Sequence, residues 1–261
     1  MSYSLFLSFT DWNGLAPHKS FIGLKNYIDF FKDPFSYVVL SNNIKWLLFA
    51  LSIPTILGLL LAIVLNGPIQ GRIFFRTIFY SPGIIPLVSS GVIWAWIYNP
   101  TFGALNSFLR MIGLGYLARG WLSDPNIALY SVMVTAAWQG VGMPMILFLA
   151  GLQDIPKELY EAAKIDGALD YHLFWYVTLP LLRETFIIVI SLAIINSLKV
   201  FDLIYTMTWG GPGRSTQVLA VWMYFNAFQY YKAGYGSTIA WLTTVLSMAI
   251  TIPYIRILSR R

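Results

Sequence analysis

The chain of 261 residues has no cysteine and only two histidines, His18 and His172. The lack of cysteine excludes a disulfide framework, a thiolate nucleophile and a cysteine metal site. The two histidines are far apart in the sequence, which argues against a histidine metal site and against a histidine-based catalytic triad. No group of residues has the pattern of an enzyme active site, so we expect a protein that is not itself an enzyme.

Charge is also scarce. Only 11% of the residues are charged, whereas soluble domains have about 25%. Hydrophobic residues make up 57% and aromatic residues 17% of the chain, which is typical of a membrane protein with aromatic belts at the interfaces. The net charge of +6 comes from scattered basic residues without a clustered stripe, so no nucleic-acid partner is expected. Residues 1–9 do not have the pattern of a cleavable signal peptide.

Long apolar runs predict membrane-spanning helices, because a span needs about 20 apolar residues. The predicted spans are about 40–66, 76–98, 127–151, 183–205 and 236–258. Pro82 and Pro86 predict a broken or bent start of the second of them. Residues 1–10 are apolar but cover only about half a bilayer, so we interpret them as the end of a truncated first span. The predicted fold class is an all-α membrane bundle of five full transmembrane helices plus this truncated one.

A polar, helix-prone segment, residues 154–180, separates two of the apolar runs. Pro156 suits the first turn of a helix, and Gly167 is a natural place for that helix to end. A short aromatic segment follows and ends at Pro180. This pattern predicts a helix–turn–helix outside the lipid with an apolar tip that docks another protein. Basic residues number eight on each side of the membrane, but those on the side of this segment lie closer to span ends, which predicts a cytoplasmic position.

The same segment resembles the Glu-Ala-Ala loop of ABC-importer permeases. The matching residues are Glu161, Ala162, Ala163, Gly167, Leu179 and Pro180, at the spacing of that loop. Val177 stands where the family pattern usually has isoleucine. Residues 21–27, 121–125 and 201–212, with Thr216, resemble the carbohydrate branch, the permeases related to maltose and glycerol-phosphate importers. The resemblance covers nearly the whole chain. Such permeases usually have six core spans, whereas the first span of this chain is predicted to be truncated.

The resemblance implies an ATP-driven sugar importer in a bacterial or archaeal cell membrane. A second permease, favoured to be a different chain, would complete the translocation path. A cytoplasmic ATPase dimer would dock on the loop, and an extracytoplasmic sugar-binding protein would deliver the substrate. The residues expected to dock the ATPase are Glu161, Ala162, Ala163, Asp166, Gly167, Leu179 and Pro180. The glycine-rich stretch 210–216 lacks the P-loop spacing, so no cofactor is expected here, and the partner ATPase would bind ATP and Mg²⁺.

The docking surface has an alternative interpretation as an ordinary amphipathic surface helix. Small side chains permit close approach of a partner, and Gly167 permits a left-handed turn between the two helices. Tyr171, Phe174 and Trp175 either extend the docking surface or pack against the neighbouring spans.

Lys199 and Asp202 are the only charged residues in the segment from Thr185 to Tyr205. Charges inside a membrane are costly and mark functional sites. Their i, i+3 spacing predicts that they share one helix face and can pair. These two residues either line a polar substrate path or have a structural role, as a salt bridge or as side chains that extend to the outer interface, and the sequence favours neither alternative. The predicted path residues are Asn196, Lys199, Asp202, Tyr205, Trp138 and Gln139.

Two other classes of function compete with the importer. The hypothesis of a secondary, ion-driven transporter predicts inverted repeats and acidic residues in the middle of the spans. Asp202 is the lone acidic residue of that kind in the predicted spans. A membrane scaffold without a transport role has no need of a docking loop with this spacing.

Overall fold

Helices form the framework of the chain in the computed structural model, which describes residues 2–259, without the side chains of residues 255 and 257–259. These residues contain no β-strand, only an isolated bridge between Thr10 and Phe21. The helices are α1 (Ser2–Ser8), α2 (Lys25–Lys32), α3 (Pro34–Asn66), α4 (Arg72–Tyr80), the 3-10 helix η1 (Ser81–Ile84), α5 (Leu87–Ile97), α6 (Ala104–Met111), the 3-10 helix η2 (Gly115–Leu117), α7 (Ala128–Gly140), α8 (Gly142–Gln153), α9 (Lys157–Ile165), α10 (Asp170–His172), the π-helix η3 (Leu173–Thr178), α11 (Leu179–Leu181), α12 (Arg183–Leu198), α13 (Asp202–Thr208), α14 (Leu219–Tyr224), the π-helix η4 (Phe225–Gln229) and α15 (Ala233–Ser259). The predicted all-α class is confirmed.

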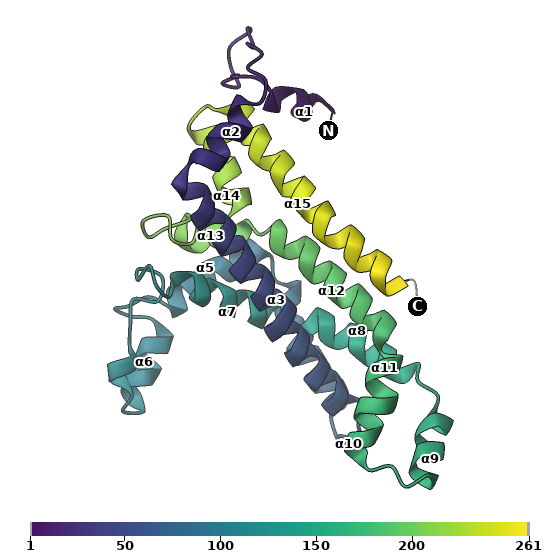
Figure 1. Cartoon of the computed structure of the whole chain (residues 1–261). Coiled ribbons are helices and arrows are strands. Elements are labelled where there is room, and N and C mark those ends of the chain that lie inside the picture. Colours follow the sequence, from purple (N-terminus) through teal and green to yellow (C-terminus); the bar gives the residue numbers. More distant parts are fainter. Residues whose placement is uncertain (1, 260–261) are drawn as a thin grey trace.

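Among the residues that the structure describes, two helices are each long and apolar enough to cross a membrane, namely α3 and the part of α15 from Ala233 to Tyr254. The side chain of Asp33 caps the start of α3 by accepting a hydrogen bond from Phe35 N at 2.9 Å. Figure 1 shows that both helices run from the end of the bundle that carries α1 and α2 toward the end that carries α9. The short helix α1, at the place of the predicted truncated span, packs against α15; residue 1 of that span lies outside the described residues.

Three further helix pairs reach the length of a span only when both members are taken together. The pair formed by α4–η1 and α5 bends by 99°, and the pair α7–α8 bends by 42°. The segment Asp170–Leu181 and α12 are bent by 65°. If each bent pair is one span, up to five spans lie within the described residues, which is the predicted number. The 99° bend lies at the prolines that predicted a broken start.

The helix of the predicted span 183–205 is interrupted in its last part. α12 ends at Leu198, and residues 199–201 are not helical before α13 begins. α13 packs against α5 instead of continuing along the axis of α12. The approach is close, because a Cβ added to Gly91 of α5 would lie 3.0 Å from Thr206 Cβ. This tertiary contact explains a helix break that has no local glycine or proline.

Helices α3, α8 and α12 pack against one another. A Cβ on Gly58 of α3 would lie only 2.6 Å from Pro144 Cβ of α8. Further along, buried apolar side chains of all three helices form one cluster, which includes Ala62, Phe148 and Val189. The small residue at position 58 therefore permits the close contact that holds the middle of the bundle together.

Gly58→Ala is expected to destabilise the folded chain by about 1–3 kcal/mol, because the added methyl group overlaps Pro144. Thermal unfolding of the purified protein in detergent measures this as a lower Tm. Gly140→Ala is the matched control, since a Cβ there meets nothing within 4 Å, and its Tm should be unchanged or slightly higher. Equal Tm values for the two variants would contradict the tight α3–α8 contact.

Candidate functional site: the polar loop and a central cavity

The polar loop, residues 154–180, projects from the end of the bundle opposite α1 and α2 (Figure 1). α9 carries no buried residue. The chain then reverses at Gly167, whose φ is +83°, and returns through α10 and η3. Two hydrogen bonds close the end of α9, from Gly167 N to Lys164 O at 3.0 Å and from Ala168 N to Ala163 O at 2.9 Å. The predicted helix–turn–helix and its glycine stop are confirmed.

The base of the polar loop is fixed to the bundle. Ile155 is buried in the cluster formed by α3, α8 and α12, and Tyr160 packs against the same cluster. The hydroxyl groups of Tyr160 and Thr178 are hydrogen-bonded at 3.0 Å, which ties α9 to η3. Close by, Gly151 of α8 allows the close approach of Thr185 on α12. The loop, α8 and α12 are therefore packed as one unit.

The predicted docking residues lie at the surface of this loop. Glu161, Ala162, Asp166, Gly167 and Pro180 are exposed, and Ala163 and Leu179 are half-buried. Tyr171 and Trp175 are each 58% exposed, so more than half of each side chain is free of contact with the rest of the chain. Phe174 is half-buried and packs edge-on against Trp175 at 5.2 Å between ring centroids. The loop thus presents carboxylates, small residues and aromatic rings on one projection.

An open cavity of about 710 Å³ lies between α3, α7, α8 and α12. Its walls are mostly apolar and include the aromatic side chains of Trp46, Phe49 and Phe201. Small-molecule sites typically enclose about 300–1,000 Å³ behind similar walls, with a few polar groups that fix the ligand. Here the polar lining residues include Thr55, Gln139, Asn196, Ser197, Lys199 and Asp202.

Gln139 is the most deeply buried amide on the cavity wall, with 6% of its surface exposed. Its Nε2 donates a hydrogen bond to Ile85 O at 2.7 Å. Its Oε1 is buried and has no hydrogen-bond partner among the described residues. A buried acceptor without a partner is costly, and it is available to a donor group of a molecule that enters the cavity.

Four of the six predicted path residues line this cavity, namely Asn196, Lys199, Asp202 and Gln139. The prediction that Lys199 and Asp202 share one helix face is wrong, because the helix is broken between them. Lys199 is the first residue of the break and Asp202 the first residue after it, and no ion pair between these two described residues is recorded within 4.0 Å. Their charged groups therefore remain available in the cavity.

The other two predicted path residues do not line the cavity. The side chain of Trp138 points in a different direction from that of its neighbour Gln139. It packs against Trp94, with ring centroids 5.5 Å apart. Tyr205 is stacked between Phe201 at 5.0 Å and Trp209 at 4.6 Å. Both side chains belong to aromatic packing beside the cavity.

The sequence analysis missed two buried amides on α3. Asn42 Nδ2 donates to Ser215 O at 2.7 Å and to Gln217 O at 3.0 Å. Asn43 Oδ1 accepts a hydrogen bond from Leu219 N at 2.8 Å. These bonds hold the glycine-rich loop after α13 against α3. Two adjacent amides in a mostly apolar predicted span were the available signal, since polar side chains in membrane helices often bond across to neighbouring elements.

Comparison with known proteins bears directly on this architecture. Residues 22–261 match the family described as the binding-protein-dependent transport system inner membrane component. The chain belongs to this family. It is 38% identical to a probable ABC transporter permease of Pyrococcus horikoshii, over 97% of this chain and 87% of that protein. It is 36% identical to the trehalose/maltose permease MalF of Thermococcus litoralis, over 92% and 81% of the two chains.

The fold agrees with this assignment. A crystal structure of a bacterial ABC transporter that imports alginate superposes with a TM-score of 0.86, over 99% of this chain and 89% of that chain, at 21% identity. The predicted resemblance, the permease bundle and the location in the cytoplasmic membrane of a bacterium or archaeon are confirmed. The description of the family ties its members to a binding protein, and the structure of a bacterial alginate transporter in complex with a periplasmic protein that holds an alginate pentasaccharide superposes with a TM-score of 0.83 at 22% identity.

Tyr160→Phe is expected to loosen the polar loop, because it removes the partner of the buried Thr178 hydroxyl. A hydrogen bond of this kind contributes about 1 kcal/mol, so amide exchange in α9 should become about fivefold faster. Hydrogen–deuterium exchange with mass spectrometry measures this, with α15 as the internal reference. Tyr176→Phe is the control, since Tyr176 is 77% exposed; the same exchange in both variants would show that this bond does not hold the loop.

Proposed function

We propose that this chain is a transmembrane subunit of an ATP-driven sugar importer. The polar loop faces the cytoplasm and docks an ATPase dimer, which binds ATP and Mg²⁺ and carries out the hydrolysis. The second permease is a different chain and completes the path, and an extracytoplasmic binding protein delivers the sugar. Relatives named for trehalose/maltose transport and for sulfoquinovosyl glycerol transport support the substrate class. The observation that carries the coupling role is the Glu161-Ala162-Ala163 motif, with Glu161 and Ala162 exposed, on a loop whose base is packed into the bundle.

The connection between the loop and the cavity is a single helix. α12 begins directly after the polar loop, and Asn196 near its other end lines the cavity. Its 16 residues span about 24 Å at 1.5 Å per residue. A displacement of the docked loop by ATP-driven closure of the ATPase moves α12 as a rigid element, which is what coupling between two distant sites requires.

The central cavity serves as part of the sugar path. Sugars present hydroxyl groups that both donate and accept hydrogen bonds. Lys199 supplies donors, Asp202 and Gln139 Oε1 supply acceptors, and the amide of Asn196 supplies both. Aromatic walls provide apolar surface for the C–H faces of the ring. A partner permease placed over the open side would enclose the substrate.

Glu161→Ala and Gly167→Ala are each expected to lower sugar-stimulated ATP hydrolysis by the co-purified importer. Glu161→Ala removes a charged group that is available for docking, which should lower the affinity for the ATPase by about tenfold or more. Gly167→Ala forces alanine into a left-handed turn with φ of +83°, at a cost of about 1–2 kcal/mol. Lys32→Ala, on α2 at the opposite end, is the control. Hydrolysis independent of Glu161 and Gly167 would refute the importer and favour an ion-driven transporter, whose uptake would persist without ATP.

Lys199→Ala is expected to reduce the uptake rate of the sugar by about tenfold, because a charged hydrogen-bond donor is lost from the path. Uptake into vesicles that contain the reconstituted importer measures the effect. Assembly with the ATPase should be unchanged on size-exclusion chromatography. Lys45→Ala, an exposed lysine on α3 outside the cavity lining, is the matched control. Loss of assembly in Lys199→Ala would instead assign Lys199 a structural role.

A further inference from the structure

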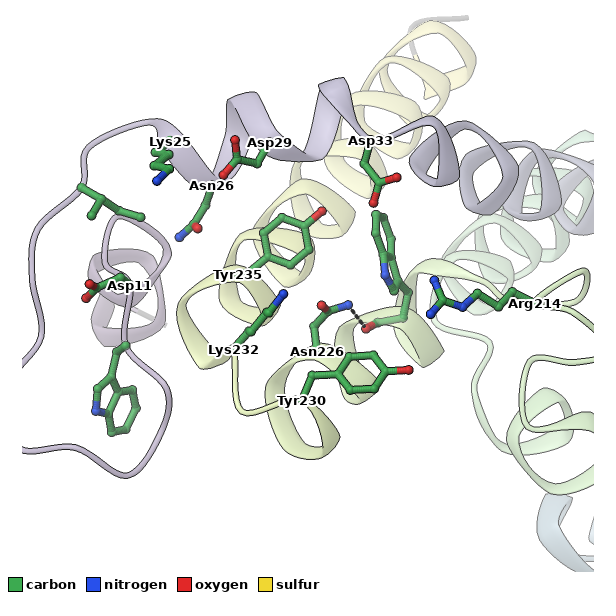
Figure 2. A pocket seen from close by; sticks show the side chains of 13 residues that line it. Asp11, Lys25, Asn26, Asp29, Asp33, Arg214, Asn226, Tyr230, Lys232 and Tyr235 are labelled. Atoms are coloured by element: carbon green, nitrogen blue, oxygen red, sulfur yellow. Dashed lines mark hydrogen bonds between the residues drawn. The ribbon is translucent and has the colours of Figure 1, made fainter.

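A second pocket, of about 590 Å³, lies at the end of the bundle opposite the polar loop. The N-terminal segment, α2, the region around η4 and the start of α15 form its walls, as Figure 2 shows. No residue lines both this outer pocket and the central cavity. None of the residues used above for the polar loop or for the central sugar path belongs to this outer pocket.

The walls of the outer pocket are held in place by the backbone. Asn26 is buried, and its Nδ2 donates to Ser8 O and Thr10 O, both at 2.9 Å. Gly234 N donates to Trp12 O at 2.9 Å. Only glycine fits at position 234, because an added Cβ would lie 3.0 Å from the carbonyl carbon of Thr10. The pocket is therefore pre-formed, as small-molecule sites usually are.

The charges of the outer pocket are balanced. Its ionisable lining residues, tyrosines aside, are Asp11, Asp29, Asp33, Lys25, Lys232 and Arg214. Figure 2 shows Asp29 on the α2 wall and Lys232 on the wall that leads into α15. The structure records no hydrogen bond or ion pair for these two side chains or for that of Lys25. A pocket with three carboxylates and three cations offers donors and acceptors to a neutral, polyhydroxylated molecule, whereas an ion would meet a group of its own sign.

Aromatic rings complete the lining. Trp12, Trp222, Tyr230 and Tyr235 belong to the wall. Tyr230 is 51% exposed, and Figure 2 shows it beside Asn226. Apolar ring faces together with carboxylate, ammonium and amide groups match the alternating C–H and hydroxyl surfaces of a saccharide. The concave shape and the size suit a small molecule better than the broad surface of a protein partner.

We infer that the outer pocket is a binding site for a neutral saccharide, separate from the central cavity. The inference rests on the proposed function for the side of the membrane, which places the pocket on the extracytoplasmic face, and for the binding protein that delivers the sugar. A sugar released by the binding protein meets this site before it reaches the central cavity.

The test measures binding of maltose, trehalose and maltotriose to the assembled importer in lipid nanodiscs, without the binding protein, by saturation-transfer NMR. At least one of the three should bind. Asp29→Asn and Lys232→Met should each weaken binding about tenfold, because each removes a charge-assisted hydrogen bond. Lys32→Met, on the same helix as Asp29 but outside the pocket lining, should bind as the wild type does.

Other results would overturn the inference. Absence of binding by all three sugars, or equal binding by Asp29→Asn, Lys232→Met and the wild type, would show that the pocket is not a saccharide site. If Asp29→Asn and Lys232→Met weakened capture of the purified binding protein and no sugar gave an NMR signal, the outer pocket would be a protein contact instead. Gln139→Leu should reduce transport and leave the signal from the outer pocket in place. Failure of the proposed function would appear separately, as ATP hydrolysis that does not respond to sugar.

Discussion

The absence of water from a bilayer is the constraint on which this structure depends. Each break in a membrane helix frees backbone groups that must find a partner inside the protein. Here polar side chains from neighbouring helices supply the partners: Gln139 bonds Ile85 O beside the sharp bend before α5, and Arg76 Nη2 donates to Leu65 O at 2.7 Å near the end of α3. Asn42 does the same for the loop after α13. These few side chains make it possible for irregular backbone to shape a cavity within an apolar bundle.

The sequence predicted the elements whose cause is local and missed those whose cause is tertiary. Apolar runs located the helices, and Pro82 and Pro86 indicated the broken one, because both signals act within a few residues. The break after Leu198 has no such signal, since its cause is the contact between α13 and α5. For that reason the inferred pairing of Lys199 and Asp202 on one helix face failed, although both residues do line the cavity.

The two parts of the candidate site differ in the same way. The turn of the polar loop was predictable because Gly167 and the hydrogen bonds around it are all local. The cavity was only partly predictable. Trp138 and Gln139 are adjacent in the sequence, but neighbours on a helix point about 100° apart, and only the packing of α7 decides which of them faces inward. Asn42 and Asn43 became informative only with their partners, more than 170 residues away.

The π-helix η3 gives the polar loop a second influence on the cavity. It forms the last part of the loop before α11 and α12, and its turns are wider than those of an α-helix. The number of residues in this stretch sets the rotational register of the helix that follows, since one residue corresponds to about 100° of rotation. In the present register, Asn196 lines the cavity. The number of residues in this part of the loop is therefore itself constrained. An insertion or deletion of one residue there would rotate α12, and with it one wall of the cavity, without changing any residue that lines the cavity.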